Sequence, residues 1–123
     1  MDILLIEDDV GLLTAMGLVL RDAGYSVLEA ADGDEGLWLF QSRGARLVVT
    51  DLMMPARDGF ETITAIKKEQ PAARILAISG GLRSGAGDLL AIALAVGADE
   101  VLAKPFALED LLATVRRLAP RAH

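Results

Sequence analysis

The chain has 123 residues, of which 53% are hydrophobic, and its formal net charge is -6. This length suits one domain, which we expect to span residues 1–123, and the apolar fraction is ample for a hydrophobic core. The lack of cysteine excludes disulfides, thiolate metal sites and cysteine nucleophiles, and the sole histidine, His123, is the last residue. The negative charge disfavours nucleic acid as a partner, because Arg116, Arg117 and Arg121 form too small a basic patch to reverse it.

The sequence shows no targeting or membrane-spanning pattern. Only the short apolar run Ile3–Ile6 follows the first two residues, which does not make a signal peptide. The longest uncharged apolar run, Leu89–Ala98, is too short to cross a bilayer. We therefore expect a cytoplasmic protein without membrane insertion.

Short apolar runs alternate along the chain with longer segments of helical period. Two glycines, Gly24 and Gly97, follow helical segments as C-terminal caps would, and Asp32 with Glu35 fits a capping box at a helix start. Strands that alternate with helices predict a parallel sheet covered on both faces. The predicted strands, in chain order, are Ile3–Ile6, Ser26–Ala30, Leu47–Thr50, Ile75–Ser79 and Val101–Ala103. The predicted helices that follow them in turn are Val10–Ala23, Gly33–Gln41, Gly59–Gln70, Asp88–Val96 and Leu108–Leu118.

Acidic residues follow two of the predicted strands. Glu7, Asp8 and Asp9 come directly after the first strand, and Asp51 ends the third. If these strands are parallel neighbours, their carboxylates converge at the carboxyl edge of the sheet, where open α/β proteins place their ligands. Concentrated negative charge is costly there unless a hard cation or protons neutralise it. The pattern predicts one cation site.

Several known ways of binding or transferring phosphate do not fit the residues that follow these predicted strands. Neither the dinucleotide pattern G-x-G-x-x-G nor the P-loop pattern follows the first strand, and its three acids would repel a pyrophosphate. A haloacid-dehalogenase-like phosphatase would carry a second acid two residues after its aspartate nucleophile. The chain has Met53 at that position.

Four motifs stand at predicted strand ends: Ile3–Asp9, Asp51-Leu52-Met53-Met54-Pro55 with Asp58-Gly59, Ser79, and Lys104-Pro105-Phe106. Together they resemble the receiver domain of two-component response regulators. The resemblance covers nearly the whole chain and implies a flavodoxin-like, CheY-like α/β fold, a doubly wound five-stranded parallel sheet in the order 2-1-3-4-5 with five helices. It also implies a phosphorylation-activated signalling switch or relay.

The resemblance implies roles for three strand-end residues. Asp51 corresponds to the phosphoacceptor, and Lys104 to the lysine that pairs with the acidic site at rest and with the phosphoryl group after transfer. Ser79 corresponds to the hydroxyl that donates a hydrogen bond to that group. The bond between Lys104 and Pro105 is usually cis in this family.

The resemblance also implies Mg2+ as the cofactor, with Mn2+ as a possible substitute. Its ligands would be the Asp8 and Asp51 carboxylates and the Met53 backbone carbonyl. Glu7, where many relatives have aspartate, would hold a metal-bound water, although direct contact remains open. Asp9 would only add to the negative electrostatic field of the site.

The chain departs from the family pattern around its fourth and fifth strands. Val101 stands where many receivers carry Tyr or Phe, so the usual inward swing of that ring is not available. The glycine-rich segment from Gly80 to Gly87 is longer than usual. We hypothesise that its ordering over the phosphoryl group replaces the aromatic swing; the alternative is a loose surface loop without a role.

The fourth predicted helix has almost no polar face. Leu89, Ile92, Ala93 and Val96 share the stripe that can face the sheet, while Leu90 and Leu94 form a second stripe. A surface of this kind predicts recognition of an output protein or a second copy, and the alternative is an alanine-rich helix that is half exposed. The residues assigned to this partner surface are Leu90, Leu94 and Val101.

The first helix has an unusual outer face, and the second carries three large apolar residues. The outer face of the first helix is small and uncharged, so another helix could approach it, although tight packing inside the domain explains its glycines equally well. This outer face consists of Gly11, Thr14, Ala15, Gly17 and Leu18. On the second helix, Leu37, Trp38 and Phe40 are interpreted as core and flank.

Three functions remain under consideration. The leading one is a stand-alone receiver, not an enzyme for external substrates, that takes a phosphoryl group from a histidine kinase or histidine phosphotransfer protein and then changes a protein contact. The second is a phosphorylation-independent binding module that acts through the apolar fourth helix. The third, a magnesium-dependent phosphatase, is disfavoured because no dedicated general acid is visible.

Overall fold

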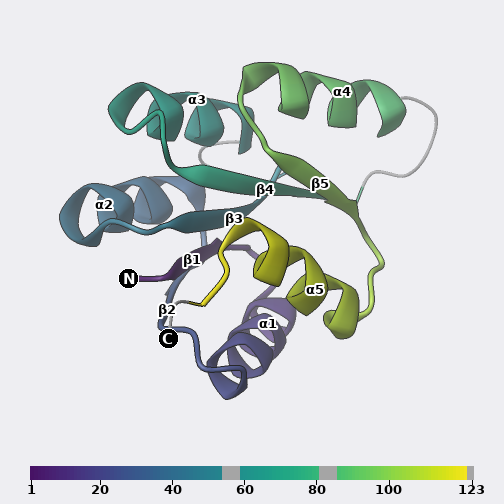
Figure 1. Cartoon of the computed structure of the whole chain (residues 1–123). Coiled ribbons are helices and arrows are strands. Elements are labelled where there is room, and N and C mark those ends of the chain that lie inside the picture. The colour runs from purple at the N-terminus through teal and green to yellow at the C-terminus, as the bar shows by residue number, and fades with distance from the viewer. Residues whose placement is uncertain (54–58, 81–85, 122–123) are drawn as a thin grey trace.

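A five-stranded parallel β-sheet with helices on both faces forms the core of the computed structural model (Figure 1). The structure describes residues 1–53, 59–80 and 86–121, and only the backbone of residues 86–90. Each predicted element is present, with ends that differ by at most two residues. The elements are β1 (Ile3–Ile6), α1 (Val10–Asp22), β2 (Val27–Ala30), α2 (Gly33–Arg43), β3 (Leu47–Asp51), α3 (Gly59–Glu69), β4 (Arg74–Ser79), α4 (Ala86–Val96), β5 (Glu100–Ala103) and α5 (Leu108–Leu118).

The strand order is β2-β1-β3-β4-β5, which confirms the predicted topology. β1 pairs in parallel with both β2 and β3, and in the second pairing Ile6 lies opposite Thr50. The residues that follow β1 therefore lie beside Asp51 at the end of β3. This register is what brings the two acidic segments of the sequence together.

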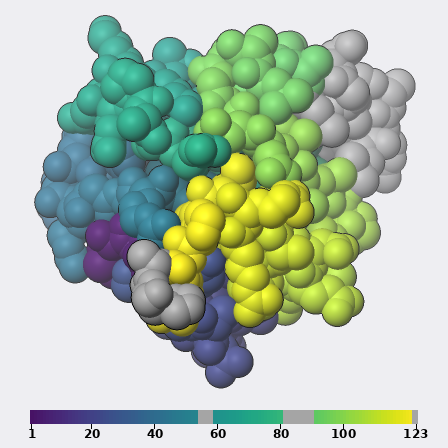
Figure 2. Space-filling model, in the orientation of Figure 1, coloured from purple at the N-terminus to yellow at the C-terminus, as the bar shows by residue number. Residues whose placement is uncertain are grey.

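The sheet separates two hydrophobic clusters. α1 and α5 cover one face, where Met16 and Leu111 are fully buried, and α2, α3 and α4 cover the other, where Phe40 and Ile66 are buried. The space-filling view shows α5 on the near face, with α4 above it and α1 below (Figure 2). Both faces of the strands are thus removed from water, which accounts for their nearly continuous apolar sequences.

The helix ends follow the capping signals of the sequence. The Asp32 side chain accepts a hydrogen bond from the Glu35 N–H at 2.8 Å, and the Glu35 side chain accepts one from the Ala31 N–H at 2.8 Å. Gly24 and Gly97, which follow α1 and α4, have φ values of 98° and 130°. These values lie in the region that glycine adopts most readily, so both stops agree with the expectation.

The outer face of α1 differs from the expectation at Gly17. Leu18 is exposed as expected, but Gly17 is buried. A Cβ atom there would collide with the Glu29 carboxylate and the Arg21 guanidinium, which form an ion pair at 2.6 Å. Gly17 therefore makes room for a contact between α1 and the edge strand β2, so tight packing inside the domain explains this glycine.

The apolar side chains of α2 and α4 divide differently from the predicted stripes. Ile92 was expected to face the sheet, but it is 47% exposed, whereas the neighbouring Ala93 is fully buried. The small Ala93 side chain lies at the contact with the sheet-side cluster, and the bulkier Ile92 lies beside that contact. Leu94 is 49% exposed, and Trp38 is 64% exposed and lies outside the core. The side chains of Leu89 and Leu90, and residues 81–85 of the glycine-rich segment, lie outside the described residues.

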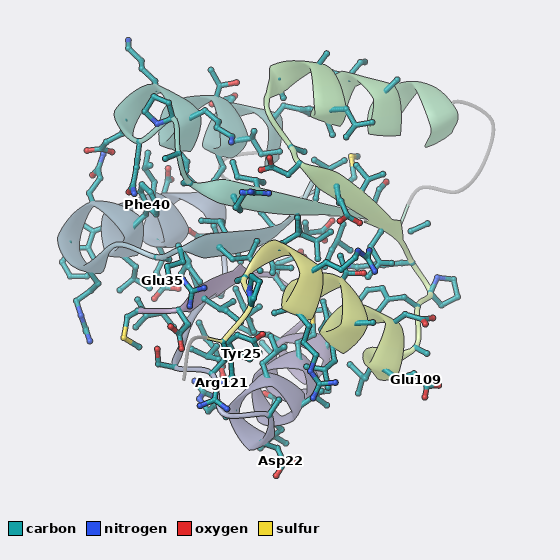
Figure 3. The ribbon with its side chains drawn as sticks, in the orientation of Figure 1. Asp22, Tyr25, Glu35, Phe40, Glu109 and Arg121 are labelled. Carbon is teal, nitrogen blue, oxygen red and sulfur yellow. The ribbon has the colours of Figure 1, made fainter. Side chains whose placement is uncertain are left out.

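The segment after α5 is attached to the edge of the sheet opposite the acidic residues. The buried Tyr25 hydroxyl donates a hydrogen bond to the Ala119 carbonyl at 2.9 Å, and the Arg46 guanidinium donates to the Pro120 carbonyl at 2.7 Å. The Arg121 guanidinium lies near Tyr25 and donates to the Ala23 carbonyl at 3.4 Å (Figure 3). These contacts fix the C-terminal end of α5 against α1 and the strand beginnings.

Within the described ranges, every helix is too short or too polar to cross a membrane.

Candidate functional site

Acidic side chains from two strand ends converge at the carboxyl edge of the sheet. Glu7, Asp8 and Asp51 each have one carboxylate oxygen that lies within 4.8 Å of the corresponding oxygens of the other two. Glu7 and Asp51 are buried, while Asp8 is exposed. The structure thus places these three residues in one pocket, as the parallel neighbouring strands require.

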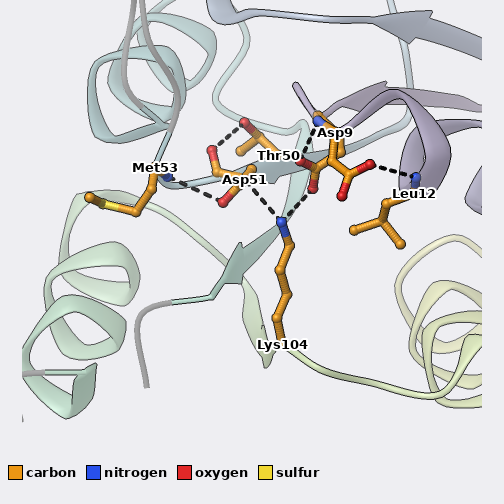
Figure 4. A network of polar contacts seen from close by, with 7 residues as sticks. Asp9, Leu12, Thr50, Asp51, Met53 and Lys104 are labelled. Atoms are coloured by element: carbon orange, nitrogen blue, oxygen red, sulfur yellow. Dashed lines mark hydrogen bonds and ion pairs between the residues drawn. The ribbon is translucent and has the colours of Figure 1, made fainter. Parts of the chain in front are cut away.

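Lys104, which follows β5, bridges the carboxylates of the other two strands. Its ammonium lies 3.0 Å from Asp51 Oδ2 and 2.8 Å from Glu7 Oε1 (Figure 4). The Lys104 N–H also donates to the Ser79 carbonyl at 2.8 Å, which anchors the backbone at the base of this side chain. The peptide bond between Lys104 and Pro105 is cis, as the family resemblance implied.

Glu7 is fully buried and held from both sides of its carboxylate. Oε2 accepts a hydrogen bond from the Asp9 N–H at 3.0 Å, and Oε1 faces the Lys104 ammonium. Burial raises the pKa of the Glu7 carboxyl, the nearby Asp51 charge raises it further, and the contacts with Lys104 and the Asp9 N–H offset only part of this effect. A cation near Glu7 therefore stabilises its ionised form.

The two carboxylates keep Lys104 charged. Burial alone would lower the pKa of the Lys104 ammonium, but its contacts with Glu7 and Asp51 outweigh burial and leave the pKa above the ordinary value. The side chain is still 22% exposed, so part of it is open to solvent. This arrangement makes Lys104 a fixed positive charge beside Asp51.

Asp51 sits at the start of a tight turn. Its Oδ1 accepts a hydrogen bond from the Met53 N–H at 3.2 Å, the side-chain-to-backbone contact of an Asx-turn. Because Lys104 engages the other oxygen, Oδ2, both carboxylate oxygens have defined partners. The orientation of Asp51 is therefore set on two sides.

Two further residues that the sequence singled out lie on β4 and β5. Ser79 is buried at the end of β4, next to Ile78, which lies opposite Asp51 in the register. Val101 is partly buried and packs on the cluster beneath α4, and its assignment to a partner surface stays a prediction.

Asp9 has a role that its position in the acidic motif concealed. Its Oδ1 accepts a hydrogen bond from the Leu12 N–H at 3.1 Å and caps the N-terminus of α1. An aspartate directly before a helical pattern is itself a capping signal, so the sequence could have revealed this role.

The donor atoms of the pocket fit a hard divalent cation. All of its side-chain ligands would be carboxylate oxygens, which Mg2+ and Mn2+ prefer. Among the described residues, none donates a hydrogen bond of good geometry to the buried Glu7 Oε1, although the Lys104 ammonium lies close to it. This oxygen can therefore accept from a metal-bound water, which fits the ion that the family resemblance implies.

A surface hollow of about 390 Å³ opens beside the pocket. It is lined by the N-terminal turn of α1 and by the segment after β5, with Asp9 and Leu12 on one side and Lys104 and Phe106 on the other. The hollow leads from solvent to the Lys104 side chain.

Comparison with known proteins decides the family. The family model described as response regulator receiver domain matches residues 3–116. This chain belongs to that family. The receiver domain is also 39% identical over 119 residues to the response regulator MprA of Mycolicibacterium vanbaalenii, and 34% identical to a probable transcriptional regulator ycf27 of Cyanophora paradoxa.

These two alignments cover 97% of the chain but only 50% and 48% of the relatives. The chain thus spans about half the length of the curated relatives it matches. The solved chemotaxis protein CheY4 of Vibrio cholerae superimposes with a TM-score of 0.86 at 31% identity, covering 95% of this chain and 97% of that protein.

Membership of this family carries a general function. Receiver domains are phosphorylation-activated signalling switches that take phosphoryl groups from histidine kinases, act on output partners and generally bind Mg2+ at an acidic pocket. The comparisons do not favour the phosphorylation-independent binding module.

Proposed function

We propose that this chain accepts a phosphoryl group on Asp51 from the phosphohistidine of a histidine kinase or histidine phosphotransfer protein. The observation that supports this most directly is the Lys104 ammonium held 3.0 Å from Asp51 in a pocket of converging carboxylates. Phosphoryl transfer depends mainly on positioning and charge neutralisation, and this pocket supplies both.

In the proposed reaction, an oxygen of the Asp51 carboxylate attacks the phosphorus atom. The bond between phosphorus and the donor's nitrogen breaks, and the donor leaves with that electron pair. Lys104, already beside Asp51, pairs with the phosphoryl oxygens after transfer, and the Ser79 hydroxyl donates a hydrogen bond to the same group. Mg2+ bound to Asp8, Asp51 and the Met53 carbonyl, with Glu7 reaching it through water, would neutralise the charge of the phosphoryl group.

Phosphorylation is proposed to change a protein contact rather than turn over an external substrate. The exposed part of α4 is the candidate surface, because Leu94 and Ile92 are both about half exposed on an apolar helix. Either an output protein or a second copy of the chain would bind there. A Leu94→Glu variant should lose this contact while a Leu18→Glu variant, changed on α1, keeps it.

Intact mass spectrometry after incubation with acetyl phosphate and Mg2+ tests the phosphoacceptor. We expect one phosphoryl increment, lost with Asp51→Asn and with a chelator. Asp9→Asn is the matched control: it removes a neighbouring carboxylate yet keeps a good helix cap, so it should still be phosphorylated. An Asp51→Asn protein that gains the full increment would contradict the assignment.

A further inference from the structure

The peptide group that joins Asp51 to Leu52 is held at both of its polar ends. Its carbonyl oxygen accepts a hydrogen bond from the Thr50 hydroxyl at 3.1 Å (Figure 4). Its N–H donates to the Ile78 carbonyl of β4 at 2.9 Å. The peptide plane cannot rotate without weakening at least one of these hydrogen bonds.

The Thr50 hydroxyl lies where an apolar group would be expected. The side chain is fully buried, and its register partners Ile6 and Ala77 both belong to the hydrophobic cluster between the sheet and α2, α3 and α4. A buried hydroxyl is costly unless it forms a hydrogen bond, and valine has nearly the same shape without that cost. Packing therefore does not explain the hydroxyl, whereas its bond to Asp51 does.

α3 encloses the same peptide from another side. A Cβ atom on Gly59 would collide with the Asp51 carbonyl oxygen and would lie 2.6 Å from the Leu52 Cα. The Gly59 N–H also donates to the Leu52 carbonyl at 3.1 Å. The backbone that follows Asp51 is thus confined by β3, β4 and the start of α3.

The orientation of this peptide bears on one of the two contacts that orient the Asp51 carboxylate. The peptide directs the chain to Met53, whose N–H donates to Asp51 Oδ1 at 3.2 Å. Because Met53 is only two residues from Asp51, a rotation of this peptide would shift the backbone that carries the Met53 N–H and carbonyl. The Thr50 hydroxyl therefore acts on the carboxylate through the intervening backbone.

We propose that Thr50 is a positioning residue for phosphoryl transfer. Its hydroxyl fixes the peptide after Asp51, and that peptide holds the Asp51 carboxylate and the Met53 carbonyl in the arrangement that the reaction needs. The inference rests on the proposed function of Asp51 as phosphoacceptor. Such preorganisation by a residue that does not touch the substrate contributes to rate because small misplacements of a reacting group are costly.

Two substitutions separate the hydroxyl from the shape of the side chain. Thr50→Val keeps the shape and removes the hydroxyl; Thr50→Ser keeps the hydroxyl and removes a buried methyl group. With acetyl phosphate and saturating Mg2+, we expect the phosphorylation rate to fall about three- to tenfold in Thr50→Val, and to stay within about twofold of the original in Thr50→Ser.

Stability should rank these variants in the opposite order. In urea, Thr50→Ser should unfold earlier than Thr50→Val, because the lost methyl group leaves a small cavity. A purely structural role would make the less stable variant the slower one. A Thr50→Val protein with an unchanged rate, or a Thr50→Ser protein as slow as Thr50→Val, would overturn the proposal.

Amide hydrogen exchange provides a test that does not require phosphorylation. The Leu52 N–H should exchange at least several times faster in Thr50→Val than in the original protein, and not in Thr50→Ser. If the original protein accepts no phosphoryl group, the proposed function fails, and Leu52 exchange alone then decides whether the hydroxyl fixes the peptide. Unchanged exchange in Thr50→Val would refute that statement.

Discussion

Gly59 offers the sharpest test of how tightly α3 closes on the phosphoacceptor peptide. In Gly59→Ala the new methyl group meets backbone atoms of Asp51 and Leu52, which cannot move aside as a flexible side chain can. Overpacking of this kind costs about 1–3 kcal/mol, and alanine returns about 0.5–1 kcal/mol through its better helix propensity. We therefore expect a net loss of about 1–2 kcal/mol in the free energy of unfolding.

Gly11→Ala is the matched control, because Gly11 also lies in the first turn of a helix. A Cβ atom there has its nearest neighbour, Asp9 Oδ1, at 3.4 Å, an ordinary contact. The same substitution should therefore stabilise the protein by about 0.5–1 kcal/mol. The two glycine-to-alanine changes are expected to have opposite signs.

Urea denaturation followed by far-UV circular dichroism measures both effects. Tryptophan fluorescence is the poorer probe, because Trp38 is largely exposed in the folded protein. Gly59→Ala should also slow phosphorylation, whereas Gly11→Ala should not. If Gly59→Ala were as stable as the original protein, the close approach of α3 to the Asp51 backbone would be refuted.

Three other changes probe contacts at the two edges of the sheet. Lys104→Met removes the cation beside Asp51, so saturating Mg2+ should raise the melting temperature of this variant more than that of the original; an equal rise would contradict the charge argument. A hydrogen bond from the Ser26 N–H lowers the pKa of the Asp2 carboxyl below its ordinary value of 3.8. The stability that Asp2 contributes is therefore present above pH 3.8 and is lost as the pH falls through the lowered pKa of the folded protein. Asp2→Asn should therefore lose less stability in acid, as urea titrations across this range would show. Tyr25→Phe removes a buried hydrogen bond to the segment after α5 and should cost about 1 kcal/mol in the free energy of unfolding; an unchanged urea midpoint would contradict this.

The sequence was sufficient to predict the sheet and the convergence of the acidic residues. Apolar runs bounded by acids or glycines marked the strands, and alternation with helical segments required parallel pairing. Once β1 and β3 are neighbours, Glu7 and Asp51 must lie at the same edge. The capping signals at Asp32, Gly24 and Gly97 also produced the local structure that their chemistry predicts.

The features that the sequence did not reveal depend on contacts between elements. Helical periodicity cannot distinguish Ile92 from Ala93 as the residue at the sheet, because the distance between helix and sheet decides which one fits. Gly17 makes room for an ion pair between α1 and β2, two elements whose contact is not visible in the pattern. The contact of Thr50 depends on the rotation of one peptide, which no sequence pattern encodes.

The charges of the resting pocket explain why a cation and a phosphoryl group should bind together. Among the described residues, the carboxylates of Glu7, Asp8 and Asp51 gather beside the Lys104 ammonium, which contacts Glu7 and Asp51, and these four side chains together carry an excess of negative charge. A divalent cation can balance that excess, but an anionic phosphoryl group on Asp51 would restore it. Lys104 would then gain a new anionic partner beside the carboxylates it already contacts. Phosphorylation would therefore redistribute the contacts of Lys104. Because Lys104 lies in the segment between β5 and α5, the change at Asp51 would reach that segment through this side chain.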